Sequence, residues 1–293
     1  MTGHIAIYGK GGVGKSTLMA NISAAMTEAG FKVLLVGCST NAESCALLNG
    51  GLAIPTVSDS LRSGDSPAAG DLLRQGFKGA ALLELGVPAD RAAGSSDATL
   101  AECFDWIEAA HLIENTHADY VLYDISGNDL LEQYYQQIRR VGNVCLYLAT
   151  TADYLALRAV NGFIAAIGRL GREYDSVLFG GLIPNAVSNS FEDTFIADFA
   201  GRTSSHLLGH VPRSLMVRQC ELYGKTVIEA AHQSNQSYYY RRLANQMVDI
   251  STGHGGRQQP RAMADDKLRE WAAEWGDRLY ALENGLVADG AAI

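Results

Sequence analysis

The sequence predicts an α/β fold in which a mostly parallel sheet is flanked by helices on both faces. Short apolar runs alternate along the chain with segments of helical length, and this alternation is typical of βαβ units. The runs are largely apolar throughout, as expected of strands that are covered on both faces. The predicted strands span residues 5–8, 32–36, 120–123, 144–149 and 177–182.

The first predicted βαβ unit begins at the start of the chain. Ile5-Ala6-Ile7-Tyr8 is a short apolar run, residues 16–29 carry apolar side chains at helical spacing, and residues 32–36 form the next run. Residues 51–96 differ, because they are rich in Gly, Ala, Ser and Asp and show no clear strand period. We expect them to form a surface excursion of the same domain, with a modest helical stretch at 71–75.

The C-terminal part of the chain has a different pattern. Residues 251–262 are polar and rich in glycine, which indicates a linker. Beyond it, apolar residues recur at three- and four-residue steps: Leu268, Trp271, Trp275, Leu279 and Leu282. This spacing predicts an amphipathic helix that packs on the body or on a partner. The predicted division is a nucleotide-binding domain at 1–250, a linker at 251–262, and a C-terminal amphipathic helix and tail at 263–293.

The composition is that of an ordinary globular protein. Of 293 residues, 47% are hydrophobic and 19% are charged, which argues against long-range disorder. The net charge is −9 and the pI is near 5.2. Nucleic acids and anionic membranes attract mainly Lys and Arg, so we expect no nucleic-acid partner. The Tyr- and Arg-rich stretch at 238–242 is interpreted as a helix face rather than a platform for stacking bases.

Location and metal binding are also constrained by the sequence. The N-terminus lacks a basic segment followed by an apolar stretch, and no apolar run approaches about 18 residues, so we expect a cytoplasmic protein without membrane insertion. The five cysteines are scattered and form no CxxC pair, which indicates free thiols. The seven histidines show no metal-ligand spacing, and Glu192 and Asp193 suit the first turn of a helix. We assign none of these residues a chemical role.

The strongest functional signal is a glycine-rich loop between the first strand and the first helix. Gly9-Lys10-Gly11-Gly12-Val13-Gly14-Lys15-Ser16-Thr17 fits GxxxxGK[ST] in the strand–helix context that this motif needs. Glycine permits close backbone approach, so successive amides can point at phosphate oxygens. Lys15 is expected to reach the β- and γ-phosphates, and the Ser16 hydroxyl to ligate Mg²⁺. The sequence therefore predicts a P-loop NTPase that binds ATP or ADP with Mg²⁺; a glycine turn without a ligand is the alternative.

A second motif follows a later strand. Asp124-Ile125-Ser126-Gly127 fits DxxG and closes the run at 120–123. A carboxylate at the carboxyl end of a strand beside the phosphate loop can hold a water of the Mg²⁺ shell, and a glycine amide can sense a γ-phosphate. We predict these roles for Asp124 and Gly127; a plain turn aspartate is the alternative.

Lys10, one residue after the first glycine of the loop, marks a subgroup of P-loop proteins. The motif resembles that of the MinD, ArsA and nitrogenase iron protein class. This resemblance implies that Lys10 reaches across a face-to-face homodimer to the partner's nucleotide.

A closer resemblance rests on several segments in order. Residues 6–17, Val36-Gly37-Cys38, 180–185, Val211-Pro212-Arg213 and 226–229 resemble the nitrogenase iron protein family, which includes a subunit of dark-operating protochlorophyllide reductase. The match covers about residues 4 to 250. It implies a homodimeric ATPase whose two subunits share one [4Fe–4S] cluster and which passes electrons to a partner when ATP closes the dimer.

The same resemblance implies an adenine pocket. Asn185 and Gln236 fall where the family binds the adenine, and Arg213 and Glu221 stand near that pocket. Asn and Gln suit adenine because each amide offers both a donor and an acceptor. Taken alone, each residue reads as an ordinary surface side chain.

The chain departs from the family at the cluster ligands. The family needs two cysteines per subunit, since four thiolates at the dimer axis ligate four irons. Where they belong, this chain reads Gly-Ser-Ser-Asp at 94–97 and Leu-Leu-Glu at 130–132. We therefore expect the iron–sulfur cluster to be absent. Cys103 lies a few residues beyond the first site, and we interpret it as a buried thiol; an unusual ligand is the alternative.

Two departures concern hydrolysis. Ser39 stands where the family has an aspartate near Mg²⁺, and Asn128 stands where it has an aspartate that orients water, with Asp129 one position later. Loss of a positioned carboxylate typically removes about 10²–10⁴-fold of rate. We expect slow hydrolysis at most, with Lys10, Lys15, Asp124 and Asp129 as the candidate catalytic residues.

Three functions fit these observations. The preferred one is a homodimeric, ATP/Mg-binding nucleotide switch without the cluster, which acts on an unknown protein partner through ATP-dependent conformational change. The second is an ATP-dependent iron–sulfur reductase that donates electrons to a nitrogenase-like partner. The third is a non-hydrolysing, nucleotide-bound scaffold.

Overall fold

The computed structural model describes residues 2–39, 41–63, 67–86, 99–125, 131–174, 177–254 and 259–285. The strands are β1 (Gly3–Tyr8), β2 (Val33–Gly37), β3 (Arg74–Gln75), β4 (Ala81–Glu84), β5 (Tyr120–Asp124), β6 (Val144–Thr150), β7 (Leu178–Val187) and β8 (Val211–Pro212). The longer helices are α1 (Lys15–Glu28), α4 (Leu100–Ala109), α6 (Leu131–Val141), α7 (Tyr154–Glu173), α8 (Ser190–Arg202), α9 (Leu215–Leu222), α11 (Asn235–Asp249) and α12 (Asp265–Glu283). Shorter helices are α2 (Val57–Arg62), α3 (Ala69–Leu72), α5 (Leu112–Thr116) and α10 (Val227–Ala230).

The described strands form an eight-stranded sheet in the order β3-β4-β2-β5-β1-β6-β7-β8. All neighbouring pairs are parallel except β3 and β4. The predicted fold class is therefore confirmed, and the five predicted strands correspond to β1, β2, β5, β6 and β7. The interpretation of 51–96 as a surface excursion without strands is wrong, because buried β4 extends the sheet beside β2.

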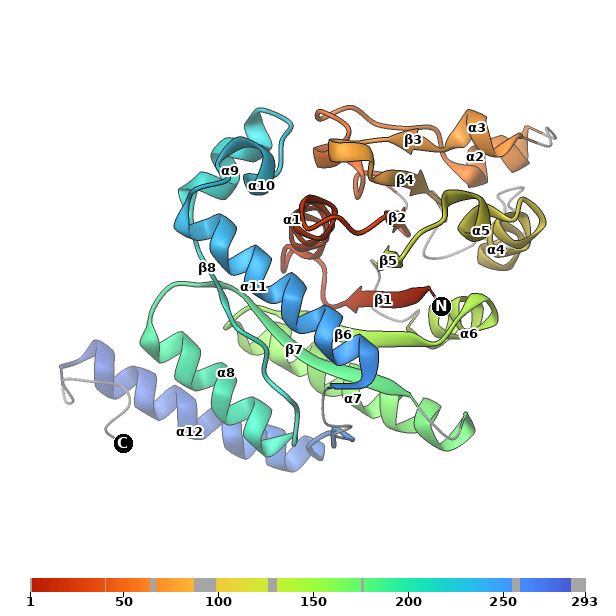
Figure 1. Ribbon diagram of the computed structural model, residues 1–293. Helices are drawn as coiled ribbons and strands as arrows, with labels where there is room; N and C mark the ends of the chain where they lie inside the picture. Colours follow the sequence, from red (N-terminus) through yellow and green to blue (C-terminus); the bar gives the residue numbers. More distant parts are fainter. Residues whose placement is uncertain are drawn as a thin grey trace.

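Helices cover both faces of the sheet (Figure 1). One hydrophobic core lies beneath α1, α9, α10 and α11, and the other lies beneath α4, α6, α7, α8 and α12. The sheet residues of both cores are almost fully buried. This layering explains why the strand runs are apolar throughout rather than alternating.

Helix α12 packs on the body of the protein through α8. Leu268, Trp271 and Trp275 are buried, whereas Leu279 of the same predicted stripe is exposed. The indole nitrogens of both tryptophans donate hydrogen bonds to Asp198 Oδ2 of α8, at 2.7 and 2.8 Å. The sequence left open whether this helix packs on the body or on a partner, and the structure shows it packed on the body. The division of the chain at 250 and 262 stays a prediction.

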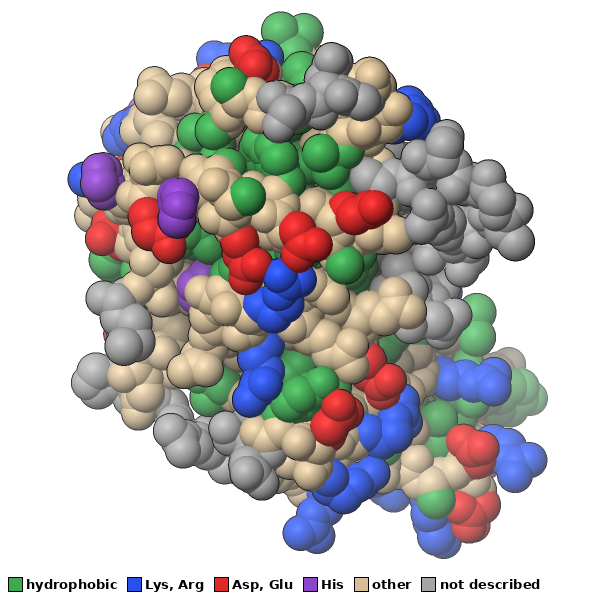
Figure 2. Space-filling view, turned by 90° about the vertical axis from the view of Figure 1, so that its right-hand side faces the viewer, with side chains coloured by type: hydrophobic (Ala, Val, Ile, Leu, Met, Phe, Trp, Pro, Cys, Tyr) green, Lys and Arg blue, Asp and Glu red, His purple; other side chains and the backbone are tan. Residues whose placement is uncertain are grey.

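Salt bridges connect the helices on one side of the molecule. Arg140 of α6 pairs with Asp105 and Glu108 of α4, and Arg169 of α7 pairs with Glu132 of α6. Figure 2 shows this side, with acidic and basic side chains close together on its surface. Such exposed pairs contribute about 0–1 kcal/mol each to the stability of the fold. Burial of the apolar cores therefore stabilises the packing of these helices more than the pairs do. In the described part of the chain, no helix is both long and apolar enough to cross a membrane.

Candidate nucleotide-binding site

The glycine-rich loop runs from the end of β1 to the first turn of α1, as predicted. Gly14 precedes α1 with φ at +85°, in the left-handed region that favours glycine. Asn185 Nδ2 lies 2.5 Å from where a Cβ on Gly14 would sit, so a side chain there would collide. Gly11 and Gly12 are exposed, which leaves their backbone open to a ligand.

Lys15 lies beneath this loop and is 6% exposed. Its amine donates a hydrogen bond to the Lys10 carbonyl at 3.1 Å. Burial lowers the pKa of the Lys15 amine from its ordinary value, and the nearby Asp124 carboxylate opposes that shift. Lys15 is thus a buried cation held at the loop, while Ser16 and Thr17 are half-buried at the start of α1.

Asp124 ends β5 directly beside the loop strand, where it pairs in register with Ile7 of β1. Its side chain is fully buried, and neither carboxylate oxygen has a hydrogen-bond partner among the described residues. An unpartnered buried carboxylate is costly unless a cation or a bound water completes it. The arrangement fits a hydrated Mg²⁺ next to the loop, with Asp124 and Ser16 as the residues that would hold it.

The four predicted adenine residues lie in two places. Asn185 Nδ2 donates to the Val13 carbonyl at 2.8 Å, and Glu221 of α9 accepts a 2.6 Å hydrogen bond from Thr17. These two residues therefore contact the phosphate loop and its helix.

The other two predicted adenine residues lie at the end of β8. Gln236 is buried and donates to the Pro212 carbonyl at 3.3 Å. Arg213 is exposed and donates to Ser188 Oγ at 3.1 Å. Gly127 and Asp129 lie outside the described residues, as do Asn128 and the segment 94–97.

Comparison with known proteins agrees with this site. The sequence matches the family of 4Fe–4S iron–sulfur cluster binding proteins called NifH/frxC over residues 3–277. It is 37% identical over 288 residues to nitrogenase iron protein 2 of Paenibacillus durus, across 98% of this chain and 97% of that protein. The chain belongs to the NifH/frxC family. The resemblance inferred from the motifs is thereby confirmed, and membership supports an ATP-dependent nucleotide switch.

Other similar proteins extend the comparison. The nitrogenase iron protein of Methanospirillum hungatei JF-1 is 32% identical over 247 residues, 83% of this chain and 87% of that protein. The septum site-determining protein MinD of Pyrococcus horikoshii OT3, solved with Mg-ADP, aligns with a TM-score of 0.66 and 22% identity. That alignment covers 87% of this chain and 98% of MinD, and it shows a shared fold.

The cysteines of this NifH/frxC chain do not fit a shared cluster. All five lie in the described part of the chain, and all five thiols are buried. Cys103 packs in the core beneath α4, and burial raises the pKa of its thiol to about 12. Thiolates ligate the irons of such clusters, whereas every cysteine of this chain is a buried thiol in the described protomer.

Glu84 is a site residue that the sequence analysis missed. It ends β4 and is fully buried, and its Oε1 accepts a 2.7 Å hydrogen bond from the Cys45 amide. Its Oε2 lies against Gly37 of β2 and has no partner among the described residues. Burial raises the pKa of Glu84 to about 7, and the Asp124 carboxylate adds to that increase.

The sheet register explains how Glu84 and Asp124 come close. Gly37 pairs with Glu84 on one side and with Asp124 on the other. Because aligned residues of parallel neighbours point to the same face, both carboxylates lie on one face across a residue without a side chain. In the sequence, the signal was a single glutamate at the end of the apolar run Ala81-Leu82-Leu83.

Proposed function

We propose that the protein is a homodimeric nucleotide switch that binds ATP with Mg²⁺, lacks the [4Fe–4S] cluster of its family, and acts on a protein partner through ATP-dependent conformational change. One contrast carries the proposal. The phosphate loop retains Lys15, and beside it Asp124 has a buried carboxylate without a partner among the described residues, whereas all five thiols of the chain are buried.

Each site residue has a proposed role. The loop amides and Lys15 bind the phosphates, while Ser16 and Asp124 hold Mg²⁺. Asn185, Glu221, Arg213 and Gln236 would surround the nucleoside. Two of them already connect β7 to the loop and α9 to α1, and Gln236 connects α11 to β8. Gly127 would respond to the γ-phosphate, and Asp129 is the candidate for orienting the attacking water. Lys10 is proposed to contact the nucleotide of the second protomer.

The family description favours a second candidate, an ATP-dependent iron–sulfur reductase. It requires a cluster held by ligands other than exposed cysteines. The third candidate, a nucleotide-bound scaffold, shares the binding site with the switch and differs only in its response to ATP.

Iron content and nucleotide binding separate the first two candidates. The protein is purified without oxygen, reconstituted with iron and sulfide, and assayed for iron and for ATP–Mg²⁺ binding. The proposal expects no stoichiometric iron together with saturable ATP binding, and Lys15→Ala should abolish binding. Four irons per dimer would support the reductase and overturn the proposal.

The response to ATP separates the switch from the scaffold. Hydrogen exchange of the whole chain is compared with ADP and with a non-hydrolysable ATP analogue. If the protein is a switch, we expect the protection of backbone amides from exchange to differ between the two nucleotides. Identical exchange with both would support the scaffold.

A further inference from the structure

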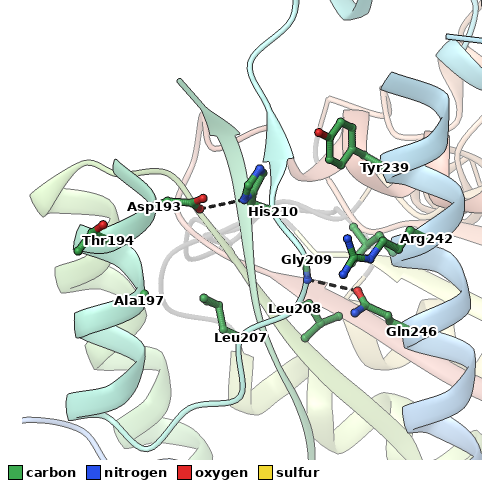
Figure 3. A pocket seen from close by; sticks show the side chains of 11 residues that line it. Asp193, Thr194, Ala197, Leu207, Leu208, Gly209, His210, Tyr239, Arg242 and Gln246 are labelled. Carbon is green, nitrogen blue, oxygen red and sulfur yellow. Dashed lines mark hydrogen bonds and ion pairs between the residues drawn. The ribbon is translucent and has the colours of Figure 1, made fainter. Parts of the chain in front are cut away.

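A cavity outside the nucleotide site lies at the β8 edge of the sheet. It has a volume of about 450 Å³ and is bordered by α8, the segment before β8, and α11 (Figure 3). Pockets for small organic ligands commonly span about 300–1,000 Å³. We call it the edge pocket and define it by Asp193, Ala197, Leu208, His210, Tyr239 and Arg242.

The edge pocket is mainly apolar, with its polar groups arranged along its two sides. Leu208 and Ala197 contribute to the apolar lining. On one side, Asp193 pairs with His210 Nδ1 at 2.9 Å, and the His210 ring stacks with the Tyr239 ring at a centroid distance of 6.0 Å. A flat apolar body would replace water against these surfaces, which is favourable because apolar surface is removed from water.

Arg242 of α11 supplies the only cation of the pocket that lacks a partner among the described residues. Its neighbour Gln246, one turn on, is already engaged, since its Oε1 accepts from the Gly209 amide at 3.2 Å. The guanidinium extends toward the Gly209 segment (Figure 3), and Gly209 has no side chain to fill the space between them. The Arg242 side chain is exposed at the border of the pocket. A free guanidinium beside an apolar surface is suited to a carboxylate, which it can bind through two parallel hydrogen bonds.

The charges limit the ligand further. Asp193 also borders the pocket, and its carboxylate would repel an additional negative charge on the ligand. We propose that the edge pocket binds a small organic monocarboxylate with a flat apolar body, its carboxylate on Arg242 and its body against Tyr239 and Leu208. A phosphate or a dicarboxylate suits this combination less well.

The test uses 1-naphthoate as a probe and its neutral amide, 1-naphthamide, as the matched ligand. Binding to the full chain is followed by NMR, through the Gly209 backbone amide and the Gln246 side-chain amide. We expect saturable shifts of both signals with 1-naphthoate, and binding at least about tenfold weaker with 1-naphthamide, because a hydrogen bond to a charged group is lost.

Three variants locate the binding. Arg242→Gln should weaken 1-naphthoate binding about ten- to a hundredfold, and Ala197→Phe should abolish it by filling the pocket. Arg269→Gln is the control, since that exposed arginine donates to the Asp265 carbonyl of its own helix and does not line the pocket. Thermal unfolding confirms that each variant is folded.

Three results would overturn the proposal. They are equal affinity for the acid and the amide, unchanged affinity in Arg242→Gln, and loss of 1-naphthoate binding when the protein is saturated with Mg-ADP. The last result would place the probe in the nucleotide site. Failure of the chain to bind ADP leaves the other two criteria intact, so this inference can fail or succeed independently of the proposed function.

Discussion

At the scale of single residues, Glu84 connects three parts of the protein. Its backbone belongs to β4, its carboxylate lies against Gly37 of β2, and it holds the Cys45 amide in the segment after β2. That segment begins at Cys38 and includes Ser39, the position at which the resemblance implies an aspartate near Mg²⁺. A buried acid here fixes the backbone of a segment whose first amide, that of Cys38, donates to the Asp124 carbonyl at 3.0 Å.

Glu84 should make stability depend on pH. Its pKa is about 7 in the folded protein and 4.5 as a free side chain, so the native state binds more protons than the unfolded state between these values. Its contribution to stability is therefore fully present below pH 4.5 and is lost as pH rises through 7, by at most about 3 kcal/mol. Glu84→Gln keeps an oxygen for the Cys45 amide and removes the titration.

Urea unfolding at pH 5 and pH 8 measures this effect. We expect the stability of Glu84→Gln relative to the native sequence to be more favourable at pH 8 than at pH 5. Glu43→Gln, an exposed acid in the same segment, is the control and should show no such change. If the difference in unfolding free energy between Glu84→Gln and the native sequence were the same at both pH values, Glu84 would not titrate as proposed.

Gly37 should be intolerant of even one methyl group. A Cβ at this position would overlap the Glu84 carboxylate, which is packed in the core and has little room to move. We expect Gly37→Ala to destabilise the protein by about 1–3 kcal/mol, as overpacking typically does. Gly162→Ala in α7 is the matched control, because no atom lies within 4 Å of its would-be Cβ. Equal unfolding midpoints for the two variants would rule out the close packing.

Some residues of the site could be predicted from the sequence, and Glu84 could not. The loop residues and Asp124 were identified because each belongs to a motif read along the chain. Glu84 belongs to no motif, and its closeness to Asp124 follows from the register of β4, β2 and β5. Pairing between strands far apart in sequence is not visible in local spacing.

At the scale of elements, length determined which strands could be predicted. Strands β3 and β8 have two residues each, and β4 has four. Such short runs give no period, and β4 lies within a stretch dominated by small and polar residues. Helix α12 was predictable because its apolar residues recur over about four turns, yet only three of the five named residues are buried. Which of the five residues are buried depends on the contact with α8. The sequence pattern of α12 alone does not contain that information.

Docking of α12 should depend on Asp198. One oxygen accepts both indole N–H groups, so Asp198→Ala leaves two buried donors unpaired. We expect a loss of about 1–3 kcal/mol, a red shift of tryptophan emission, and faster proteolysis near residues 259–264. Glu274→Gln is the control, since Glu274 makes an exposed pair with Arg202 and does not contact either indole among the described residues. Unchanged emission and proteolysis in Asp198→Ala would show that apolar contacts alone hold the helix.

At the scale of the whole molecule, the proposed switch assigns different tasks to the two lysines of the loop. Lys15 is buried and held by the Lys10 carbonyl, so its role belongs to the single protomer. The side chain of Lys10 is half-buried at the loop, and its hydrogen bond to Lys15 uses only its backbone. Replacing Lys10 by alanine therefore leaves the loop geometry in place while removing one charge.

Nucleotide affinity and oligomeric closure should consequently separate in the two variants. We expect Lys15→Ala to lose ATP binding, because the phosphates lose a buried cation. Lys10→Ala should bind ATP nearly as well as the native sequence, yet its dimer should not become more compact when ADP is replaced by a non-hydrolysable ATP analogue. Titration calorimetry measures the first property and small-angle X-ray scattering the second. A Lys10→Ala dimer that closes normally with the analogue would mean that the charge acts within its own protomer, and the contact between protomers would have to come from another residue.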